Sequence, residues 1–352
     1  MEQAGDSGRP RRTLQSVADA VGLSVNTVSR ALNDKSGVSE KTRRLIKAEA
    51  ERIGYVPNVH ARSLVLGLRK TIGVILTDLA NPFFNDLVSE IENQAIAAGY
   101  TLLLLLSDED PERERTAVNT ALSAGVDGII GVPVQGPTNP WSAVVNAHIP
   151  LVLVARELPG FQVDLYSTDN VAGRRMTTET VLRSGAKDIV LIEEDLKIST
   201  VAHRIEGFRS AVEAEGLRFH PDQVSMVPSR RTRRGASLWR GEDAYRVARD
   251  LLETGRTPDA FLAGNDYFAL GLYAALRERR IRVPEDVLVI GWGDYPFSRF
   301  LDPPLTTLRL PAVETARRAT SRLLALIDGS ATAEVVEQYL APELVHRAST
   351  NH

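Results

Sequence analysis

TLQSVADAVGLSVNTVSRALN, residues 13–33, decides the fold of the N-terminal region. Thr13 and Ser24 precede its two amphipathic segments, and Ser39 precedes a third. A hydroxyl at such a position can accept hydrogen bonds from the free N–H groups of a first helical turn. Gly22 suits the link between the first two segments, because a tight turn needs a positive φ. The sequence therefore predicts three short helices, over Leu14–Ala20, Val25–Leu32 and Glu40–Ile53.

The second predicted helix has one apolar and one polar face. Helical spacing directs three side chains inward, those of Val28, Ala31 and Leu32. The outward face carries Val25, Asn26, Ser29 and Arg30. In a helix-turn-helix the second helix lies in the major groove of DNA, where an asparagine can pair with adenine, an arginine with guanine, and a valine can touch a thymine methyl. The alternative is that Asn26 and Arg30 are solvated surface residues.

Charge is distributed unevenly along the chain. Residues 1–70 hold 13 Lys and Arg against 7 Asp and Glu, whereas the whole chain has a net charge of −3. A basic head on an acidic body indicates that the head alone contacts a polyanion such as DNA. Chance clustering of solvated charge is the alternative explanation.

From Thr71 the pattern changes to apolar strands that alternate with amphipathic helices. Such alternation predicts a parallel sheet covered on both faces, and residues 71–352 are numerous enough to form two lobes. Seven strands are predicted, over Thr71–Leu76, Thr101–Ser107, Gly128–Val132, Leu151–Ala155, Asp188–Ile192, Ala260–Ala263 and Val287–Gly291.

Several classes of protein are disfavoured by what the sequence lacks. There is no cysteine, which excludes disulfides and thiolate sites and suits a cytoplasmic protein. No apolar run reaches the roughly 18 residues of a membrane span, and the polar N-terminus does not resemble a secretory signal. The six histidines show no metal-binding spacing, and no nucleophile, phosphate or dinucleotide motif is present. We therefore expect no enzymatic activity, no metal and no cofactor.

Residues 13–33 resemble the head of LacI/GalR-family regulators, and the resemblance continues through VSEKTRRLI, IGYVPN and ARSL. It recurs in the body as TIGVILTDLANPFF, DGIIGVP, TDNVAGRR, RIEGF, AGNDYFALG, VIGWGD and PPLTTLR. The resemblance implies a two-lobed, periplasmic-binding-protein-like body with doubly wound parallel sheets behind a small all-α head. It also implies four segments, namely a flexible tail (1–12), a helix-turn-helix (13–57), a hinge helix and linker (58–70) and a ligand-binding, dimerising body (71–352). Crossovers between the lobes are expected near residues 167, 310 and 330.

The resemblance extends the expected DNA-binding set beyond the second helix. Ser24 and Thr27 are better placed for phosphates, which set register without reading sequence. Leu64 aligns with a hinge leucine that enters the minor groove beside that of a partner subunit, where an apolar wedge kinks the duplex. A linker leucine packed on the body is the alternative for Leu64. The complete set is Thr13, Ser24, Val25, Asn26, Thr27, Ser29, Arg30, Asn33, Ala61 and Leu64.

The body is expected to bind a small effector between its lobes, since ligands of such folds lie outside the carboxyl ends of the strands. The resemblance implies a pocket that contains Phe83, Phe84, Pro133, Arg156, Arg204, Trp239, Asn265, Asp266 and Asp294. For Phe83 and Phe84 the alternative is core packing, for Arg204 a surface ion pair, and for Asp266 a helix cap.

Three positions depart from the family pattern, because Ala155, Gly293 and Leu310 replace common polar residues. A buried ligand hydroxyl without a partner costs roughly 1–3 kcal/mol, which argues against a plain hexose. Arg156, Arg204 and the basic segment Arg230–Arg240 would suit a modified or anionic sugar.

Paired hinge wedges and symmetric heads imply a homodimer on pseudo-palindromic, double-stranded operator DNA. The residues after Leu340 contain no leucine heptads, so we expect a dimer and not a tetramer. Two alternatives remain: a solute-binding protein, which the head disfavours, and a weakly specific nucleoid-associated protein. The sign of the effector's influence on DNA binding is open, with release the commoner outcome in the family.

Overall fold

The computed structural model describes residues 12–55, 69–228, 241–332 and 334–351. The chain divides into two compact units, residues 1–69 and 70–352, and each is described by itself. The expected tail (1–12), apart from Arg12, and most of the expected hinge (58–70), with Ala61 and Leu64, lie outside the described residues. The same holds for Trp239 and the basic segment around it.

The head is a unit of three capped helices, α1 (Leu14–Val21), α2 (Val25–Leu32) and α3 (Glu40–Arg52). Ser24 Oγ accepts a hydrogen bond from Thr27 N at 3.1 Å, and Thr13 forms a reciprocal capping box with Ser16. Gly22 ends α1 with a φ of 69°, as the sequence predicted. The core of the head consists of Val17, Ala18, Val28, Ala31, Ile46 and Ala50.

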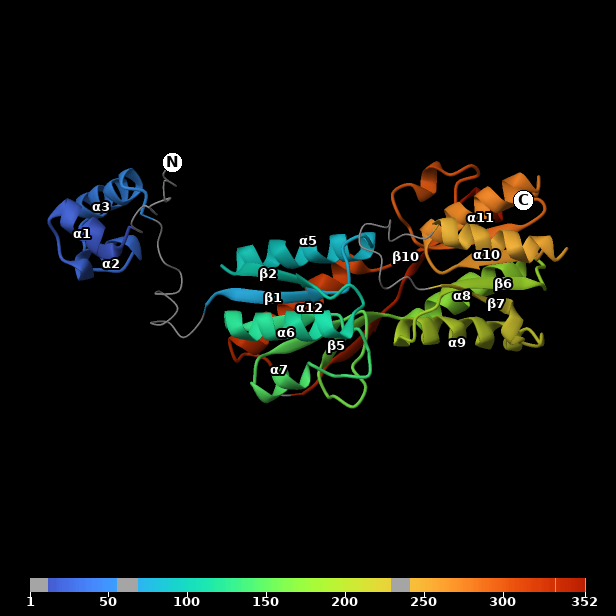
Figure 1. The fold of residues 1–352 in the computed structure, drawn as a ribbon, viewed down its shortest axis with the longest axis horizontal. Helices are drawn as coiled ribbons and strands as arrows, with labels where there is room; N and C mark the ends of the chain where they lie inside the picture. The colour runs from blue at the N-terminus through green and yellow to red at the C-terminus, as the bar shows by residue number, and fades with distance from the viewer. Residues whose placement is uncertain (1–11, 56–68, 229–240, 333, 352) are drawn as a thin grey trace, which may run out of the picture. The chain divides into compact units, whose positions relative to one another are not determined.

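The first lobe of the body is built on a six-stranded parallel sheet in the order β11-β5-β4-β3-β1-β2. Its strands are β1 (Thr71–Leu76), β2 (Thr101–Leu106), β3 (Gly128–Gly131), β4 (Leu151–Val154), β5 (Asp164–Thr168) and β11 (Glu337–Leu340). Helices α5 (Pro82–Ala97) and α12 (Ala312–Ile327) pack on one face of the sheet (Figure 1). Helices α6 (Pro111–Ala124) and α7 (Ser142–Asn146) cover the other face around the buried Trp141.

The second lobe contains a sheet in the order β12-β10-β9-β8-β6-β7, in which only β12 is antiparallel to its neighbour. Its strands are β6 (Ile189–Glu194), β7 (Val224–Val227), β8 (Ala260–Ala263), β9 (Leu288–Gly293), β10 (Thr306–Arg309) and β12 (Glu343–Val345). Helices α8 (Asn170–Arg183) and α9 (Ser199–Ala214) lie on one side of this sheet, and α10 (Gly241–Glu253) and α11 (Asp266–Glu278) on the other (Figure 1). Three short 3₁₀ turns complete the lobe, at Pro221–Gln223, Ser298–Phe300 and Ala348–Thr350.

The chain crosses between the lobes three times. The first two crossovers, after Thr168 and between β10 and α12, lie where the sequence placed them. The third was predicted near residue 330 but lies between β11 and β12, at residues 341–342. The prediction fails because residues 334–336 still belong to the first lobe, where Arg322 Nη2 donates to the Glu334 carbonyl at 2.7 Å.

Within the described residues, no helix has both the length and the apolar character needed to cross a membrane. The same residues contain no group of His, Asp and Glu that could hold a metal ion.

Candidate functional sites

The outward face of α2 has the exposure that the sequence predicted. Asn26 and Arg30 are exposed and the Val25 side chain is 36% exposed, whereas Val28 and Ala31 are buried. Burial of the opposite face in the head core leaves Val25 and Asn26, in the first turn, accessible to an external partner. A capped helix that presents its first turn in this way has the geometry required for the major groove.

Several members of the expected DNA-binding set are held by bonds within the head. Arg30 Nε and Nη2 donate to the Ser36 carbonyl at 3.0 and 2.5 Å. Asn33 Nδ2 donates to the Ser29 carbonyl at 2.8 Å, as a side chain at the C-terminus of α2 can. For Arg30, the bonds to Ser36 must open before those two N–H groups reach a base. Ser24 and Thr13 are engaged as helix caps, although their hydroxyls remain at exposed positions.

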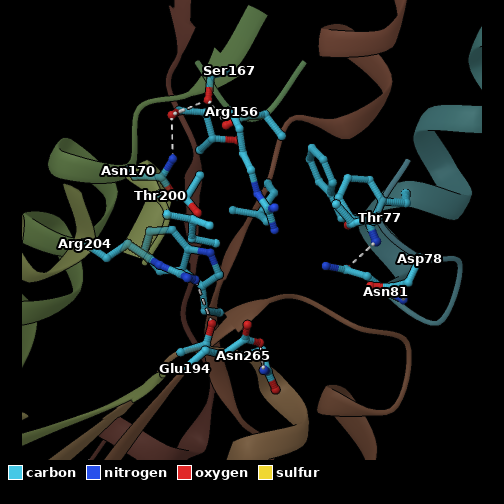
Figure 2. Close-up of a pocket in the computed structure, with 18 of the residues that line it drawn as sticks. Thr77, Asp78, Asn81, Arg156, Ser167, Asn170, Glu194, Thr200, Arg204 and Asn265 are labelled. Atoms are coloured by element: carbon cyan, nitrogen blue, oxygen red, sulfur yellow. Dashed lines mark hydrogen bonds between the residues drawn. The ribbon is translucent and has the colours of Figure 1, made fainter. Parts of the chain in front are cut away.

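A cavity of about 740 Å³, part of it open to solvent, lies between the two lobes of the body. Its walls come from the carboxyl ends of strands in both sheets, from the first turns of α5, α8 and α9, and from the N-cap of α11. Figure 2 shows Asn81, Arg156 and Arg204 reaching it from different segments. The cavity is lined by Thr77, Asp78, Asn81, Phe83, Phe84, Glu109, Ala155, Arg156, Ser167, Thr168, Asn170, Glu194, Ile198, Thr200, Arg204, Gly264, Asn265, Trp292, Tyr295 and Leu310.

The structure brings five of the sequence-predicted effector residues together in this cavity: Phe83, Phe84, Arg156, Arg204 and Asn265. Phe83 and Phe84 meet edge to face with their ring centroids 5.4 Å apart. Both rings belong also to the core of the first lobe, so each of them packs inward and faces the cavity.

Three other predicted effector residues do not line the cavity. The Pro133 carbonyl instead accepts from Arg156 Nη1 at 3.2 Å. Asp266 is buried beneath the cavity and accepts three hydrogen bonds, from Ser298 Oγ, Thr307 Oγ1 and Tyr295 N. Burial raises the pKa of Asp266, and those hydrogen bonds oppose the shift.

Asp294 is the third residue of this group, and an ion-pair network holds it away from the cavity. Its carboxylate binds Arg347 Nη2 at 2.5 Å and Arg309 Nη2 at 2.8 Å. Asp294, which the sequence placed in the effector pocket, therefore does not line the cavity.

Arg156 reaches the cavity with its charge already balanced. Its two terminal nitrogens bind the Glu109 carboxylate in a bidentate pair, at 2.8 and 2.5 Å. Burial disfavours the charged guanidinium, but the nearby carboxylates of Glu109, Glu194 and Asp78 together outweigh it and raise the pKa of Arg156. The preceding Ala155 has a φ of 64° and turns the chain at the end of β4.

Arg204 belongs to a buried triad that sequence reasoning missed. Glu193 is fully buried and binds Arg174 Nη2 and Arg204 Nη2, each at 3.2 Å. Both guanidinium carbons lie over the Trp292 ring, at 4.5 Å for Arg174 and 5.3 Å for Arg204. Burial lowers the pKa of Arg174 to about 10. Among the described residues, Arg174 Nε and Nη1 and Arg204 Nε find no hydrogen-bond partner.

The remaining polar wall was also missed, although a positional signal existed. Thr77 and Asp78 directly follow β1, and Glu194 ends β6, so the rule about carboxyl ends of parallel strands points to all three. The Thr77 hydroxyl is fully buried and has no hydrogen-bond partner within the described part of the chain. Burial raises the pKa of Asp78, whose carboxylate accepts from Ala80 N and Asn81 N.

The chain matches two family models. Residues 13–58 match the bacterial regulatory proteins of the lacI family, and residues 178–350 match a periplasmic binding protein-like domain. The relatives include the HTH-type transcriptional repressor PurR of Pasteurella multocida, 30% identical over 96% of this chain and 98% of the relative. They also include the HTH-type transcriptional regulator DegA of Bacillus subtilis, 31% identical over 97% and 98%.

Solved structures agree with this assignment. The Lac repressor dimer bound to operator and the anti-inducer ONPF has a TM-score of 0.81, with 26% identity, and the match covers 96% of this chain and 99% of that one. The CelR–cellobiose complex has a TM-score of 0.71, with 26% identity and coverage of 96% and 100%. The relatives are transcriptional regulators, which confirms the expectation that the chain is not an enzyme. The chain therefore belongs to the lacI family of bacterial regulatory proteins, with a DNA-binding helix-turn-helix head and a ligand-responsive, periplasmic-binding-protein-like body.

Proposed function

We propose that this protein is a cytoplasmic repressor that binds a pseudo-palindromic operator as a homodimer and responds to a small, sugar-like effector. One observation carries the proposal: the chain joins an exposed, capped α2 to a body whose cavity is lined by polar and aromatic side chains. Effector and operator binding are then coupled through the body, and the coupling free energy is reciprocal.

Substitution of Asn26 tests whether the head recognises DNA bases directly. It lies exposed in the first turn of α2, and an asparagine there can bond adenine through two hydrogen bonds. Asn26→Ala should lower affinity for the selected operator by about 1–3 kcal/mol while leaving affinity for random DNA unchanged. The matched control is Glu51→Gln, at an exposed position of α3. An equal loss on operator and random DNA would show that Asn26 does not read bases.

A neutral, hydroxyl-rich effector suits the described cavity better than the anionic one that the sequence suggested. Arg156 is neutralised by Glu109, and Arg204 shares Glu193 with Arg174. Asp78 and Glu194 add two further carboxylates to the wall. The Thr77 hydroxyl, which has no partner among the described residues, and the Asp78 carboxylate are groups that bond sugar hydroxyls. The Phe83 and Phe84 rings offer an apolar surface.

The CelR complex contains cellobiose, which makes neutral disaccharides a reasonable first class of probe. Titration calorimetry should compare cellobiose and neutral monosaccharides with uronic acids and sugar phosphates of the same ring size. Binding of neutral members alone supports the proposal, and binding confined to the acidic members refutes it. Arg204→Met should abolish whatever binding is found, because Arg204 lines the cavity from α9.

Exposed apolar side chains on the body support the homodimer. Phe300 is 81% exposed in the turn after β9, Ile96 on α5 is 63% exposed, and Leu270 on α11 is 37% exposed. The related Lac repressor was solved as a dimer, and we infer that a partner subunit covers these side chains. Sedimentation of the intact protein should give a dimer, and Phe300→Asp should shift it toward monomer. A monomeric wild-type protein at micromolar concentration would refute the dimer.

A further inference from the structure

Helix α9 begins without a cap of its own. Its N-cap residue is Ile198, whose side chain cannot accept a hydrogen bond. The first N–H groups of any helix need an acceptor from outside the helix, and capping side chains usually supply one. Here the acceptor for Ser199 N is Gln135 Oε1, at 2.8 Å. Gln135 is 64 residues away in sequence and follows β3 in the first lobe, whereas α9 belongs to the second lobe.

Gln135 makes two further hydrogen bonds at the same place. Its Nε2 donates to Ser199 Oγ at 3.0 Å and to the Glu157 carbonyl at 2.7 Å. The side chain is therefore fixed to its own lobe at Glu157 and to the other lobe at Ser199. It satisfies both ends of its amide, which gives the contact a defined geometry.

The loop that carries Gln135 is itself held rigidly. Glu114 Oε1, buried in the first lobe, accepts from Val134 N at 2.7 Å and from Trp141 Nε1 at 2.8 Å. Gln135 has a φ of 58°, in the left-handed region, which few residues other than glycine adopt. A preformed loop pays little entropy to hold its side chain in one place, so the contact to Ser199 retains more of its free energy.

Helix α9 is the wall of the cavity that this contact supports. Thr200, in the first turn, and Arg204, one turn later, both line the cavity. Arg204 Nη1 also donates to the Gly264 carbonyl at 3.0 Å, so the position of α9 fixes the position of its guanidinium. Any shift of the first turn of α9 moves groups that face the effector.

A second hydrogen bond crosses the cleft, but its loss would not uncap a helix. Tyr295 Oη donates to Asn81 Oδ1 at 3.1 Å. Asn81 already caps α5 by accepting from Phe83 N, so α5 stays capped when the lobes separate. When Gln135 and Ser199 separate, α9 loses the side-chain acceptor for its first N–H.

We propose that Gln135 is a positioning residue that caps α9 across the cleft, so that the α9 wall of the cavity is complete only while the lobes are closed. Separation of the lobes then breaks the capping hydrogen bond of α9 as well as the interlobe contacts. The ligand-free body therefore favours the closed state. The inference rests on the proposed effector cavity for its role in function. Its test uses protein without ligand, so a failure to find an effector leaves the result intact.

Hydrogen exchange of the intact, ligand-free protein measures the cap directly. The peptide that contains Ser199 should exchange about five- to tenfold faster in Gln135→Ala than in wild type, the factor expected when an N-cap is lost. Gln135→Glu keeps an acceptor oxygen for Ser199 N but sets a carboxylate oxygen against the Glu157 carbonyl, so it should slow exchange at Ser199 relative to Gln135→Ala without fully restoring the wild-type rate. Gln94→Ala is the matched control, since Gln94 is a half-buried glutamine of the same lobe that bonds Glu90 on α5.

An interlobe distance separates positioning from simple stability. Since the chain has no cysteine, spin labels can be placed at Thr120→Cys on α6 and Lys187→Cys in the second lobe, both at exposed positions. Gln135→Ala should shift the distance distribution away from that of wild type while the melting temperature stays near that of Gln94→Ala. An unchanged distribution together with unchanged exchange at Ser199 would overturn the proposal. If Gln135→Ala unfolds, its distance distribution and its exchange rate no longer report the cap. Gln135→Glu then provides the test, and exchange at Ser199 that is not slowed in Gln135→Glu would also overturn the proposal.

Discussion

Glu193→Gln is the substitution with the sharpest energetic consequence. Glu193 has no exposed side-chain surface and supplies the carboxylate that both Arg174 and Arg204 bind. The Arg174 side chain is also fully buried, and that of Arg204 is 10% exposed. Replacement of the carboxylate by a neutral amide leaves two guanidinium groups side by side without a counter-charge.

The magnitude follows from the burial of the triad. Removal of one partner from a buried ion pair costs about 3–5 kcal/mol, because the other charge stays desolvated. Domains are stable by only about 5–15 kcal/mol, so Glu193→Gln should remove a large part of the stability of the body. Arg174→Met should cost less than about 1 kcal/mol, because it leaves Arg204 and Glu193 balanced. It also removes a cation whose Nε and Nη1 have no partner in the described part of the chain.

Urea unfolding of the full chain, followed by tryptophan fluorescence, measures both variants. The three tryptophans all lie within residues 70–352, so the signal reports the body and not the head. Glu206→Gln is the control, since its pair with Arg209 is half exposed and worth about 0–1 kcal/mol. The reasoning fails if Glu193→Gln is as stable as that control, or if Arg174→Met is the more damaging of the two.

Three further predictions concern other parts of the chain. Burial raises the pKa of Glu114 above its ordinary value of 4.5, so the folded state binds this proton more tightly and the contribution of Glu114 to stability falls as pH rises. The unfolding free energy of Glu114→Gln should therefore rise relative to that of wild type as pH increases from about 4.5. Denaturation curves at several pH values measure this, and a difference in unfolding free energy that does not change with pH would contradict the prediction. Gly131→Ala would bring its Cβ into a clash with Trp141 Cη2, so we expect it to lower the free energy of unfolding by about 1–3 kcal/mol in thermal or chemical denaturation. Gly160→Ala is the comparison, because its Cβ would meet no neighbour within 4 Å and its φ of 81° tests backbone strain alone. Leu64→Ala should weaken operator binding in a gel-shift titration while effector binding persists, and unchanged operator affinity would remove the minor-groove wedge from the account.

The sequence predicted the elements that are strongly periodic or strongly apolar. The bounds of α2, β1 and β8 agree with the structure because caps or continuous apolar runs mark them. The missed strands are short and partly polar, such as DLYST in β5, TTLR in β10 and EQYL in β11. Such segments become strands because a neighbouring strand offers its free backbone groups, and for β11 that neighbour, β5, is distant in sequence.

The candidate sites were predictable to the extent that position along a strand or helix defines them. Phe83 and Arg156 follow strands of the first-lobe sheet, Asn265 follows a strand of the second-lobe sheet, and all three line the cavity. Asp266 and Asp294 occupy similar positions, but neighbouring side chains bind their carboxylates instead. The pairing of Arg174 with Glu193 had no local signal, because tertiary packing brings together two elements that each look ordinary in sequence.

The charge of the head illustrates the same limit. Its excess of basic residues indicated DNA binding, yet Arg43 donates to the Ala31 and Lys35 carbonyls and Lys47 binds Asp34. Part of the basic charge therefore fixes the segment between α2 and α3. Composition alone cannot separate such structural cations from those that face a phosphate.

Selection of bound duplexes from a random pool by the full-length protein tests the central claim most directly. We expect enrichment of an inverted repeat whose half-sites depend on Asn26. Affinity for that repeat should exceed affinity for random DNA by about 10³-fold or more at physiological salt. Recovery of no common sequence, with an affinity that depends on salt but not on sequence, would identify a phosphate-only binder and contradict the account.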